Sequence, residues 1–358
     1  MDRRLRLSRW AGLVTSLSAV SGPAAFGQAP PQPLPPSIIG TAAPPAVSPA
    51  SGTVAPPPAA PVARFTADLQ AFPPETVQGV YAVWAGAGWL ARMNQSNGRF
   101  LAGFNPVIRT PVGDDTELRQ AFAALALCRA AKFTGKPELA APAVQSVLAL
   151  LAVTKPDPAD PTRRVPDLPA DRGNRVGIAA VLALAVYESP DLDATRLADA
   201  EALLAFVRSR CQPDGSIQFA EDGPANDPDV ALVPGFAVQA LAVSQRAKPN
   251  AAKRDALAKA VAYYRAAVRA KPSAPLAAAL LPGFVDVCLQ PGADATTVAS
   301  VWELADGLCQ CQYTRADARS ATWVGGFKPT PGPGGVEPTV DAALCAEGLA
   351  AAAKLTRR

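Results

Sequence analysis

The 358-residue chain contains no histidine. This absence removes Ser–His–Asp and Cys–His nucleophile systems, His-ligated zinc or iron, and the commonest general base near neutral pH. Any catalysis would have to use carboxylates, arginine, lysine, tyrosine or cysteine. The sequence predicts no metal site and no cofactor.

Aromatic residues are also scarce, at 6% of the chain, which argues against an aromatic-lined pocket of any size. The formal net charge is only +4. Several of the basic residues lie in the first ten positions and in the pair Arg357–Arg358. The rest of the chain is close to neutral, so there is no electrostatic case for a nucleic-acid partner.

Hydrophobic residues are plentiful, at 49% of the chain, and can form a sizeable core. Many of them are alanine, a strong helix former that lets helices approach closely. Six cysteines are spread along the chain, mostly inside apolar runs. In a helical domain of this size we expect them to act as small buried hydrophobes. The alternative is a disulfide from Cys309 or Cys311 to Cys345.

The first 63 residues divide into two segments. Residues 1–29 combine a basic start, a short apolar run and small residues near Ala29, which predicts an export signal peptide. The apolar run is too short to span a bilayer comfortably, and an uncleaved anchor is the alternative. Residues 30–63 are nearly all Pro, Ala, Ser, Gly and Val and predict a disordered linker. We therefore expect a periplasmic or extracellular protein with no membrane span after signal cleavage.

Residues 64–358 have a helical pattern. Apolar residues recur at three- and four-residue spacings, and Gly, Pro, Asp or Asn separate the runs. No stretch alternates as a strand does. The expected helices are Pro74–Gln95, Asp115–Thr134, Pro137–Val153, Asn174–Tyr187, Asp193–Cys211, Asp229–Ala247, Ala251–Ala270, Ala274–Leu289, Asp294–Gln312 and Pro338–Leu355. They predict one all-α domain of five or six antiparallel hairpins.

A short turn repeats along this domain. Residues 95–100, QSNGRF, match residues 212–217, QPDGSI, and a weaker third copy starts near Gln312 and reaches Phe327. Gly98 and Gly215 permit the left-handed backbone that ends a helix. After each turn comes an acidic helix start with an apolar residue seven positions later. These pairs are Asp115 with Phe122, Asp229 with Phe236, and Glu337 with Leu344. The acids are expected to cap the following helices. The period of roughly 100 residues predicts hairpins stacked in a ring or arc.

The repeated turn resembles the QW-type repeat of the terpenoid cyclase and protein prenyltransferase α/α-toroid superfamily. This resemblance implies a toroid over the helical region, and it is nearly silent on activity. The catalytic motifs of that superfamily are missing. The prenyltransferase zinc set needs a histidine, and no Asp-x-Asp-Asp acid or aromatic wall for cyclase chemistry is present.

The strongest polar cluster follows the first turn and contains Asp114, Asp115, Glu117 and Arg119. Its simplest interpretation is a helix cap with acidic residues in the first turn. In a toroid, however, the starts of the inner helices meet at one rim, which would bring Asp115, Asp229 and Glu337 together with Arg172. Carboxylates arranged in this way beside an arginine could act as acid and base on a glycan.

Two loops are further candidates. The acidic loop from Glu221 to Asp229 has the spacing of a Ca²⁺ site, although a solvated loop is the favoured interpretation. The segment 156–172 offers Arg163, Arg164 and Arg172 as donors to an anionic ligand, and the alternative is a surface insertion with balanced charge.

These observations predict an exported helical toroid that binds a ligand or partner at its rim or cavity without catalysis. A glycan or another component of the cell envelope is the expected partner. One alternative is a carboxylate-dependent polysaccharide lyase or glycoside hydrolase. The other is a structural protein of the envelope.

Overall fold

The computed structural model describes residues 69–105, 107–111, 115–168, 174–219, 232–316, 318, 320–328 and 339–357. Within these residues the chain is all-α apart from two short β-hairpins. The predicted signal peptide and linker, residues 1–63, lie outside the described residues. Of the helices described, none has both the length and the apolar character that crossing a bilayer requires.

All ten predicted helices are present close to their expected bounds. They are α2 (Pro74–Met93), α3 (Glu117–Thr134), α4 (Pro137–Ala152), α5 (Arg175–Glu188), α6 (Ala194–Ser209), α7 (Val233–Ala247), α8 (Ala251–Ala270), α9 (Ala274–Cys288), α10 (Ala295–Gln310) and α11 (Thr339–Ala353). Short 3-10 turns occur at Leu69–Ala71, Ala321–Trp323 and Lys354–Arg357.

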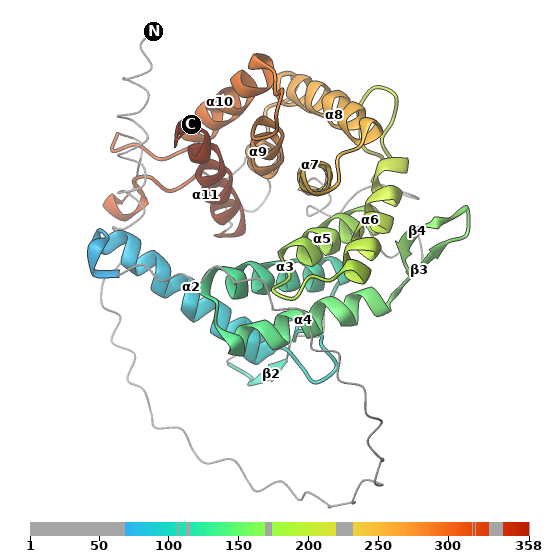
Figure 1. Ribbon diagram of the computed structural model, residues 1–358. Coiled ribbons are helices and arrows are strands. Elements are labelled where there is room, and N and C mark those ends of the chain that lie inside the picture. Colours follow the sequence, from blue (N-terminus) through green and yellow to red (C-terminus); the bar gives the residue numbers. More distant parts are fainter. Residues whose placement is uncertain are drawn as a thin grey trace, which may run out of the picture.

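The helices form two rows (Figure 1). The inner row is α3, α5, α7, α9 and α11, and each of these helices packs against the next one in the series. The outer row is α2, α4, α6, α8 and α10, whose members pack mainly on inner helices. Among the inner helices, α5 is enclosed and is apolar on all sides. Every residue of α5 from Val176 to Tyr187 is buried.

Small residues bring the inner helices into close contact. A Cβ added to Gly235 of α7 would lie 2.4 Å from the carbonyl carbon and oxygen of Ala279 in α9. A Cβ on Gly348 of α11 would lie 2.8 Å from the carbonyl oxygen of Ala278. The high alanine content therefore has the consequence expected from the sequence, since the helix backbones nearly touch.

The arc curves tightly around α5. The rings of Phe122 in α3 and Phe236 in α7 meet edge to face with centroids 4.7 Å apart, although α5 lies between these helices in the series. These are two of the apolar residues that follow the acidic positions by seven. Equivalent residues of two repeat units therefore contact each other.

The repeated turn has the same geometry in all three copies. Isolated bridges join Asn94 to Phe100, Cys211 to Ile217, and Gln312 to Phe327. In each copy the residue after the bridge donates back to the outer helix, and these hydrogen bonds are Leu101 N to Met93 O (3.0 Å), Gln218 N to Arg210 O (2.9 Å) and Lys328 N to Cys311 O (2.8 Å). A glycine with positive φ occupies each turn, at Gly98 (81°), Gly215 (94°) and Gly325 (86°). The weak third copy is therefore a true repeat with an insertion before its glycine.

Two short β-hairpins accompany the helices of this all-α fold, and the sequence did not predict them. β1 (Phe104–Asn105) pairs with β2 (Thr110–Pro111), and β3 (Thr154–Asp157) pairs with β4 (Asp160–Pro166) in antiparallel hairpins. Proline and charge hide the second hairpin in the sequence, because its strands do not alternate in polarity. Hydrogen bonds from the Arg164 side chain help to hold this hairpin against the helices.

Candidate functional site

The predicted acidic cluster lies at the start of α3, but Asp115 is not the helix cap. Thr116 is the N-cap, and its hydroxyl accepts a hydrogen bond from the backbone N–H of Arg119 at 3.2 Å. The helix begins at Glu117. The hydroxyl of Thr116 performs the capping that was assigned to the neighbouring carboxylate, so Asp115 is available for another contact.

That contact is with Arg99 of the first repeated turn. The Arg99 guanidinium lies 2.8 Å from one oxygen of Glu117, 3.0 Å from the other, and 3.2 Å from Asp115. The hydrogen bond that Arg99 donates to Glu117 is the main reason that the pKa of Arg99 is raised above its ordinary value. Asp115 and Glu117 thus share one arginine, which ties the turn to the start of α3.

Gln120 completes this connection. Its amide oxygen accepts from the backbone N–H of Phe100, and its amide nitrogen donates to the Phe100 carbonyl, both at 2.7 Å. The same nitrogen donates to Asp115 at 2.8 Å. Gln120 is buried, so these bonds form away from solvent. The cluster thus holds Phe100, the aromatic plug of the turn, against α3 of the inner row.

Sequence reasoning missed Arg99, placed Gln120 at the end of the cluster without a role, and named Arg119, which is exposed, as its basic residue. Arg99 directly precedes the aromatic plug in QSNGRF, and this position was the available signal. The remaining predicted residues, Asp114, Arg172, Asp229 and Glu337, lie outside the described residues, as does the acidic loop 221–229.

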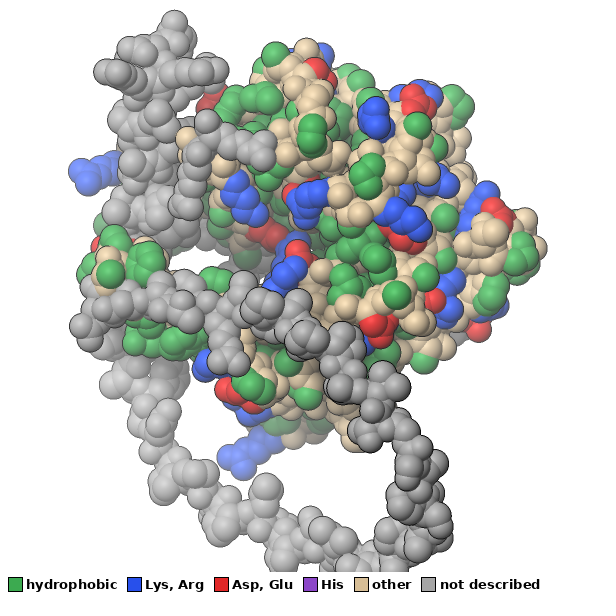
Figure 2. All heavy atoms as spheres, in the orientation of Figure 1, with side chains coloured by type: hydrophobic (Ala, Val, Ile, Leu, Met, Phe, Trp, Pro, Cys, Tyr) green, Lys and Arg blue, Asp and Glu red, His purple; other side chains and the backbone are tan. Residues whose placement is uncertain are grey.

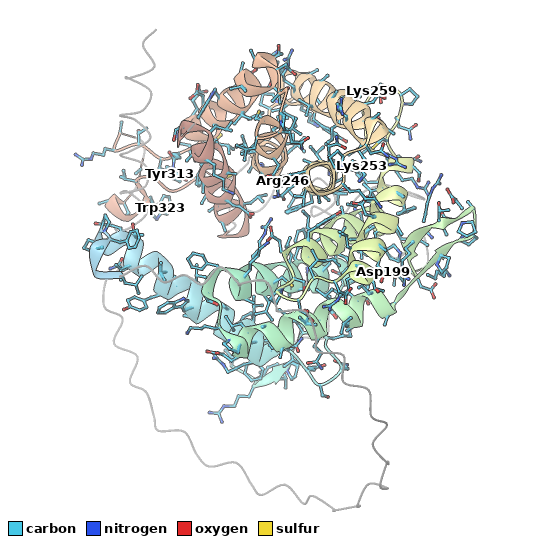
Figure 3. The ribbon with its side chains drawn as sticks, in the orientation of Figure 1. Asp199, Arg246, Lys253, Lys259, Tyr313 and Trp323 are labelled. Atoms are coloured by element: carbon cyan, nitrogen blue, oxygen red, sulfur yellow. The ribbon has the colours of Figure 1, made fainter. Side chains whose placement is uncertain are left out.

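The arginines of the segment 156–172 that the structure describes make contacts within the protein. Arg164 donates to the Thr154 hydroxyl at 2.9 Å, to Asp199 of α6 at 3.1 Å and to the Leu151 carbonyl at 3.2 Å (Asp199 is labelled in Figure 3). Arg163 pairs with Asp160 across 2.9 Å. Arg164 therefore holds the β3–β4 hairpin against the helices and is not a free donor for a ligand.

A buried ionic network connects four helices. The Lys253 ammonium of α8 lies 2.6 Å from Glu201 of α6. Glu201 also accepts from the hydroxyl of Ser244 in α7 at 2.6 Å and from that of Tyr187 in α5. Lys253 donates in addition to the backbone carbonyl of Lys248 at 3.0 Å. Nothing in the amphipathic pattern of α8 distinguishes Lys253 from an exposed lysine, so the sequence did not reveal this network.

The network sets the charge states of its members. Burial by itself would raise the pKa of Glu201, but the Lys253 ammonium and the two hydroxyls hold it below its usual range. Burial, and then the hydrogen bond to Glu201, raise the pKa of Tyr187. The lysine and glutamate are thus a charged pair that joins α6 to α8, and each oxygen of Glu201 has a partner.

A groove of about 880 Å³ lies between α8 and the turn from α9 to α10. Its floor is aliphatic and is formed by Leu257, Val261, Val287 and Leu289. The turn at its edge is capped by Asp294, whose carboxylate accepts from Thr297 N at 2.7 Å. The groove opens where the inner helices end, which is the edge opposite to the one that the sequence predicted.

Three arginines border this groove: Arg246 at the end of α7, and Arg254 and Arg265 on α8. Arg246 pairs with Asp286 at 2.9 Å, and Figure 3 shows it with Lys253 on the α7–α8 side of the arc. Within the described residues, Arg254 makes no ion pair. The spacing of eleven residues places Arg254 and Arg265 on one face of α8, about 16 Å apart along the axis. The arrangement can hold an elongated anion above an apolar floor.

None of the six cysteines forms a disulfide, and Cys128, Cys288 and Cys345 are buried. The alternative disulfide from Cys309 or Cys311 to Cys345 is therefore not formed in this structure. Burial raises the pKa of Cys128 to about 12 and the pKa of Cys288 to about 11. In the described part of the chain, no three His, Cys, Asp or Glu side chains are grouped as metal ligands.

Comparison with known proteins does not add a candidate activity. No protein-family profile, curated protein sequence or solved structure matches the chain.

Proposed function

We propose that this chain is an exported, non-catalytic helical-repeat protein that binds an acidic and partly aliphatic segment of a partner protein in the α8–α10 groove. The observation that carries the proposal is the groove itself. Three arginines surround a floor of aliphatic side chains in a volume of about 880 Å³. Such a combination of an apolar body and a few charged groups is typical of binding sites.

The state of the acidic cluster supports a non-catalytic role. A general acid and a general base need distinct environments that separate their pKa values. Asp115 and Glu117 instead share the guanidinium of Arg99, and Asp115 also accepts from Gln120. Their contacts are those of a structural fastening.

The lining of the groove favours a peptide over the glycan expected from the sequence. Sugar rings are commonly recognised by stacking on aromatic side chains, and none of the described residues that line the groove is aromatic. Leucine and valine of the floor suit aliphatic side chains, while Arg254 and Arg265 suit carboxylates. An extended segment covers the roughly 16 Å between these arginines with about five residues.

We also propose that the arc belongs to an α/α-toroid of the terpenoid cyclase and prenyltransferase kind. Three copies of one turn and two concentric rows of helices support this relationship. The export signal expected in residues 1–29 would place such a toroid in the periplasm or outside the cell. In that setting the groove would bind an envelope or secreted protein.

The binding proposal is tested with a fluorescein-labelled ten-residue peptide of alternating glutamate and leucine, followed by fluorescence anisotropy at low salt. Changing both Arg254 and Arg265 to serine is expected to weaken binding by at least about tenfold, because each lost charged hydrogen bond contributes more than about 1 kcal/mol. The matched control is Lys259→Ser, an exposed α8 cation that pairs with Asp255 and does not line the groove (labelled in Figure 3). It should leave the affinity unchanged.

Two results would overturn the proposal. One is the absence of peptide binding at millimolar concentration, or binding that is indifferent to both arginines. The other is the release of unsaturated or reducing sugars from a bacterial polysaccharide that depends on Asp115, which Asp115→Asn would reveal. That result would establish the glycan-cleaving alternative.

A further inference from the structure

Helix α2 exposes an unusually apolar surface at the beginning of the arc. Its only charged residues are Glu75 and Arg92, so residues 76–91 carry no charge. The helix packs on α3 and α4 and buries only Val80 and Ala87. Hydrophobic side chains are prominent where Figure 2 leaves α2 uncovered by grey atoms, and Tyr81, Val83 and Trp89 are exposed. A solvent-facing helix normally carries charged residues along its outer face, which makes this surface exceptional.

The outward side of α2 has a regular spacing. Glu75, Gln78, Ala82, Ala85, Trp89 and Arg92 follow one another at alternating steps of three and four residues. This spacing places them along one stripe, opposite the buried Val80 and Ala87. The stripe has small residues at its centre, larger residues beside them and one charge of each sign at its ends.

We propose that this stripe is a homodimer interface in which α2 pairs antiparallel with α2 of a second copy. About a two-fold axis between Ala82 and Ala85, every member of the stripe meets a complementary partner. Glu75 faces Arg92 of the second copy, Gln78 faces its Trp89, and Ala82 faces its Ala85. A two-fold interface requires such self-complementarity, and a lone helix stripe seldom provides it.

The charges at the two ends identify the occupant as a second copy of this chain. Within the described residues neither Glu75 nor Arg92 makes an ion pair, whereas the dimer would form this pair twice. The small central residues allow the two backbones to approach closely, as Gly235 and Ala279 do inside the protein. A lipid surface would require neither the small centre nor the opposed charges.

Gly86 provides room for the partner's larger side chains. A Cβ added there would meet no atom within 4 Å, so the surface is open at this point. Tyr81, which is 54% exposed, would lie over Gly86 of the second copy in the same register. One helix pair of 20 residues forms a small interface, and a reversible, concentration-dependent dimer is therefore expected.

Sedimentation velocity of the exported chain over a concentration series tests the proposal. The wild-type protein should shift from monomer to dimer as its concentration rises. Ala82→Arg places two unpaired charges at the centre of the interface and should raise the dissociation constant at least about a hundredfold. The matched control is Ala299→Arg on α10, an exposed alanine outside the stripe, which should dimerise as the wild type does. Circular dichroism establishes that both variants keep their helices.

A charge swap distinguishes this register from other modes of association. Glu75→Arg alone and Arg92→Glu alone should each weaken the dimer, and the double variant should restore it because the pair forms again with reversed signs. A double variant no stronger than the weaker single variant overturns the register. The proposed interface is overturned if the chain stays monomeric at about millimolar concentration. It is also overturned if the protein is a monomer that binds phosphatidylcholine vesicles and Ala82→Arg abolishes that binding.

Discussion

Two buried polar side chains, Gln120 and Lys253, hold this apolar protein together at places where helices alone would not. Gln120 satisfies both backbone groups of Phe100 and so secures the plug of the first turn. Lys253 connects α8 to α6 through Glu201. Each of these side chains makes hydrogen bonds to groups inside the protein, and its loss leaves those groups without partners.

Gln120→Leu is expected to lower the free energy of unfolding by about 2–4 kcal/mol, because it leaves the N–H and C=O of Phe100 without partners in a buried site. Urea unfolding followed by circular dichroism measures the change. Gln145→Leu is the control, since this exposed glutamine donates only to the Ser96 carbonyl, at 2.6 Å, and should cost well under about 1 kcal/mol. Equal losses in the two variants would contradict the role given to Gln120.

Lys253→Met is expected to cost about 3–5 kcal/mol at pH 7, because it leaves the Glu201 carboxylate buried without its cation. The double variant Glu201→Gln with Lys253→Met should recover most of this loss, since the glutamine oxygen can still accept from Ser244 and Tyr187. Urea unfolding of the single and double variants provides the comparison. A double variant as unstable as Lys253→Met would show that the loss is one of packing and not of charge.

The same pair predicts a pH dependence. In the wild type the pKa of Glu201 is lowered from its unfolded value of 4.5, so its contribution to stability is present above pH 4.5 and is lost as the pH falls through the folded value. Without Lys253, burial loses its largest opposing contribution, so the pKa of Glu201 is expected to rise and protonation to remove the buried charge. The stability difference between wild type and Lys253→Met should therefore shrink as the pH is lowered from 7 to about 5. Urea unfolding at both pH values checks this, and a constant difference would contradict it.

At the scale of elements, the contact between α7 and α9 depends on the absence of a side chain. Gly235→Val is expected to destabilise the protein by about 3 kcal/mol or more, because its Cβ would overlap the Ala279 carbonyl 2.4 Å away. Gly307→Ala on α10 is the control, and for this variant an increase in stability is expected. No atom lies within 4 Å of the added Cβ there, so a gain of about 0.5–1 kcal/mol is expected from helix propensity. Thermal unfolding of both variants measures the two effects, and a neutral Gly235→Val would show that α7 and α9 can separate at little cost.

The helices could be predicted from the sequence because spacing, caps and breakers agree along most of the chain. Four of the predicted helices begin at, or directly after, the residue that caps them in the structure. These caps are Asp193, Asn250, Ser273 and Asp294. The hairpins could not be predicted in this way. β3 and β4 contain proline and charge, and they are held by bonds from Arg164 to residues of α4, of α6 and of the hairpin itself. Such support depends on tertiary contacts that no local pattern reveals.

At the scale of the whole molecule, the repeat was predictable while the groove was not. Glycine is needed at Gly98 and Gly215 for local backbone reasons, so its recurrence is visible in the sequence. The groove depends on how α8 lies beside the turn from α9 to α10, and this packing cannot be read from the local sequence around its arginines. The role of Arg99 could not be predicted from the sequence for a related reason, because it depends on how the turn packs against α3.

The helical packing buries Cys128, Cys288 and Cys345 and half-buries the other three cysteines, which gives a test of the fold as a whole. Burial raises the pKa of Cys128 to about 12 and those of Cys211 and Cys288 to about 11, so the reactive thiolate is rare in the native protein at pH 8. The native protein should react slowly with Ellman's reagent, whereas the unfolded, unreduced protein should release the equivalent of all six thiols. Cys345→Ser should lower that total by one and leave the non-reduced gel mobility unchanged. A total of four in the unfolded wild type would reveal a disulfide, most simply between Cys345 and α10, and would mean that export oxidises a pair that this packing keeps apart.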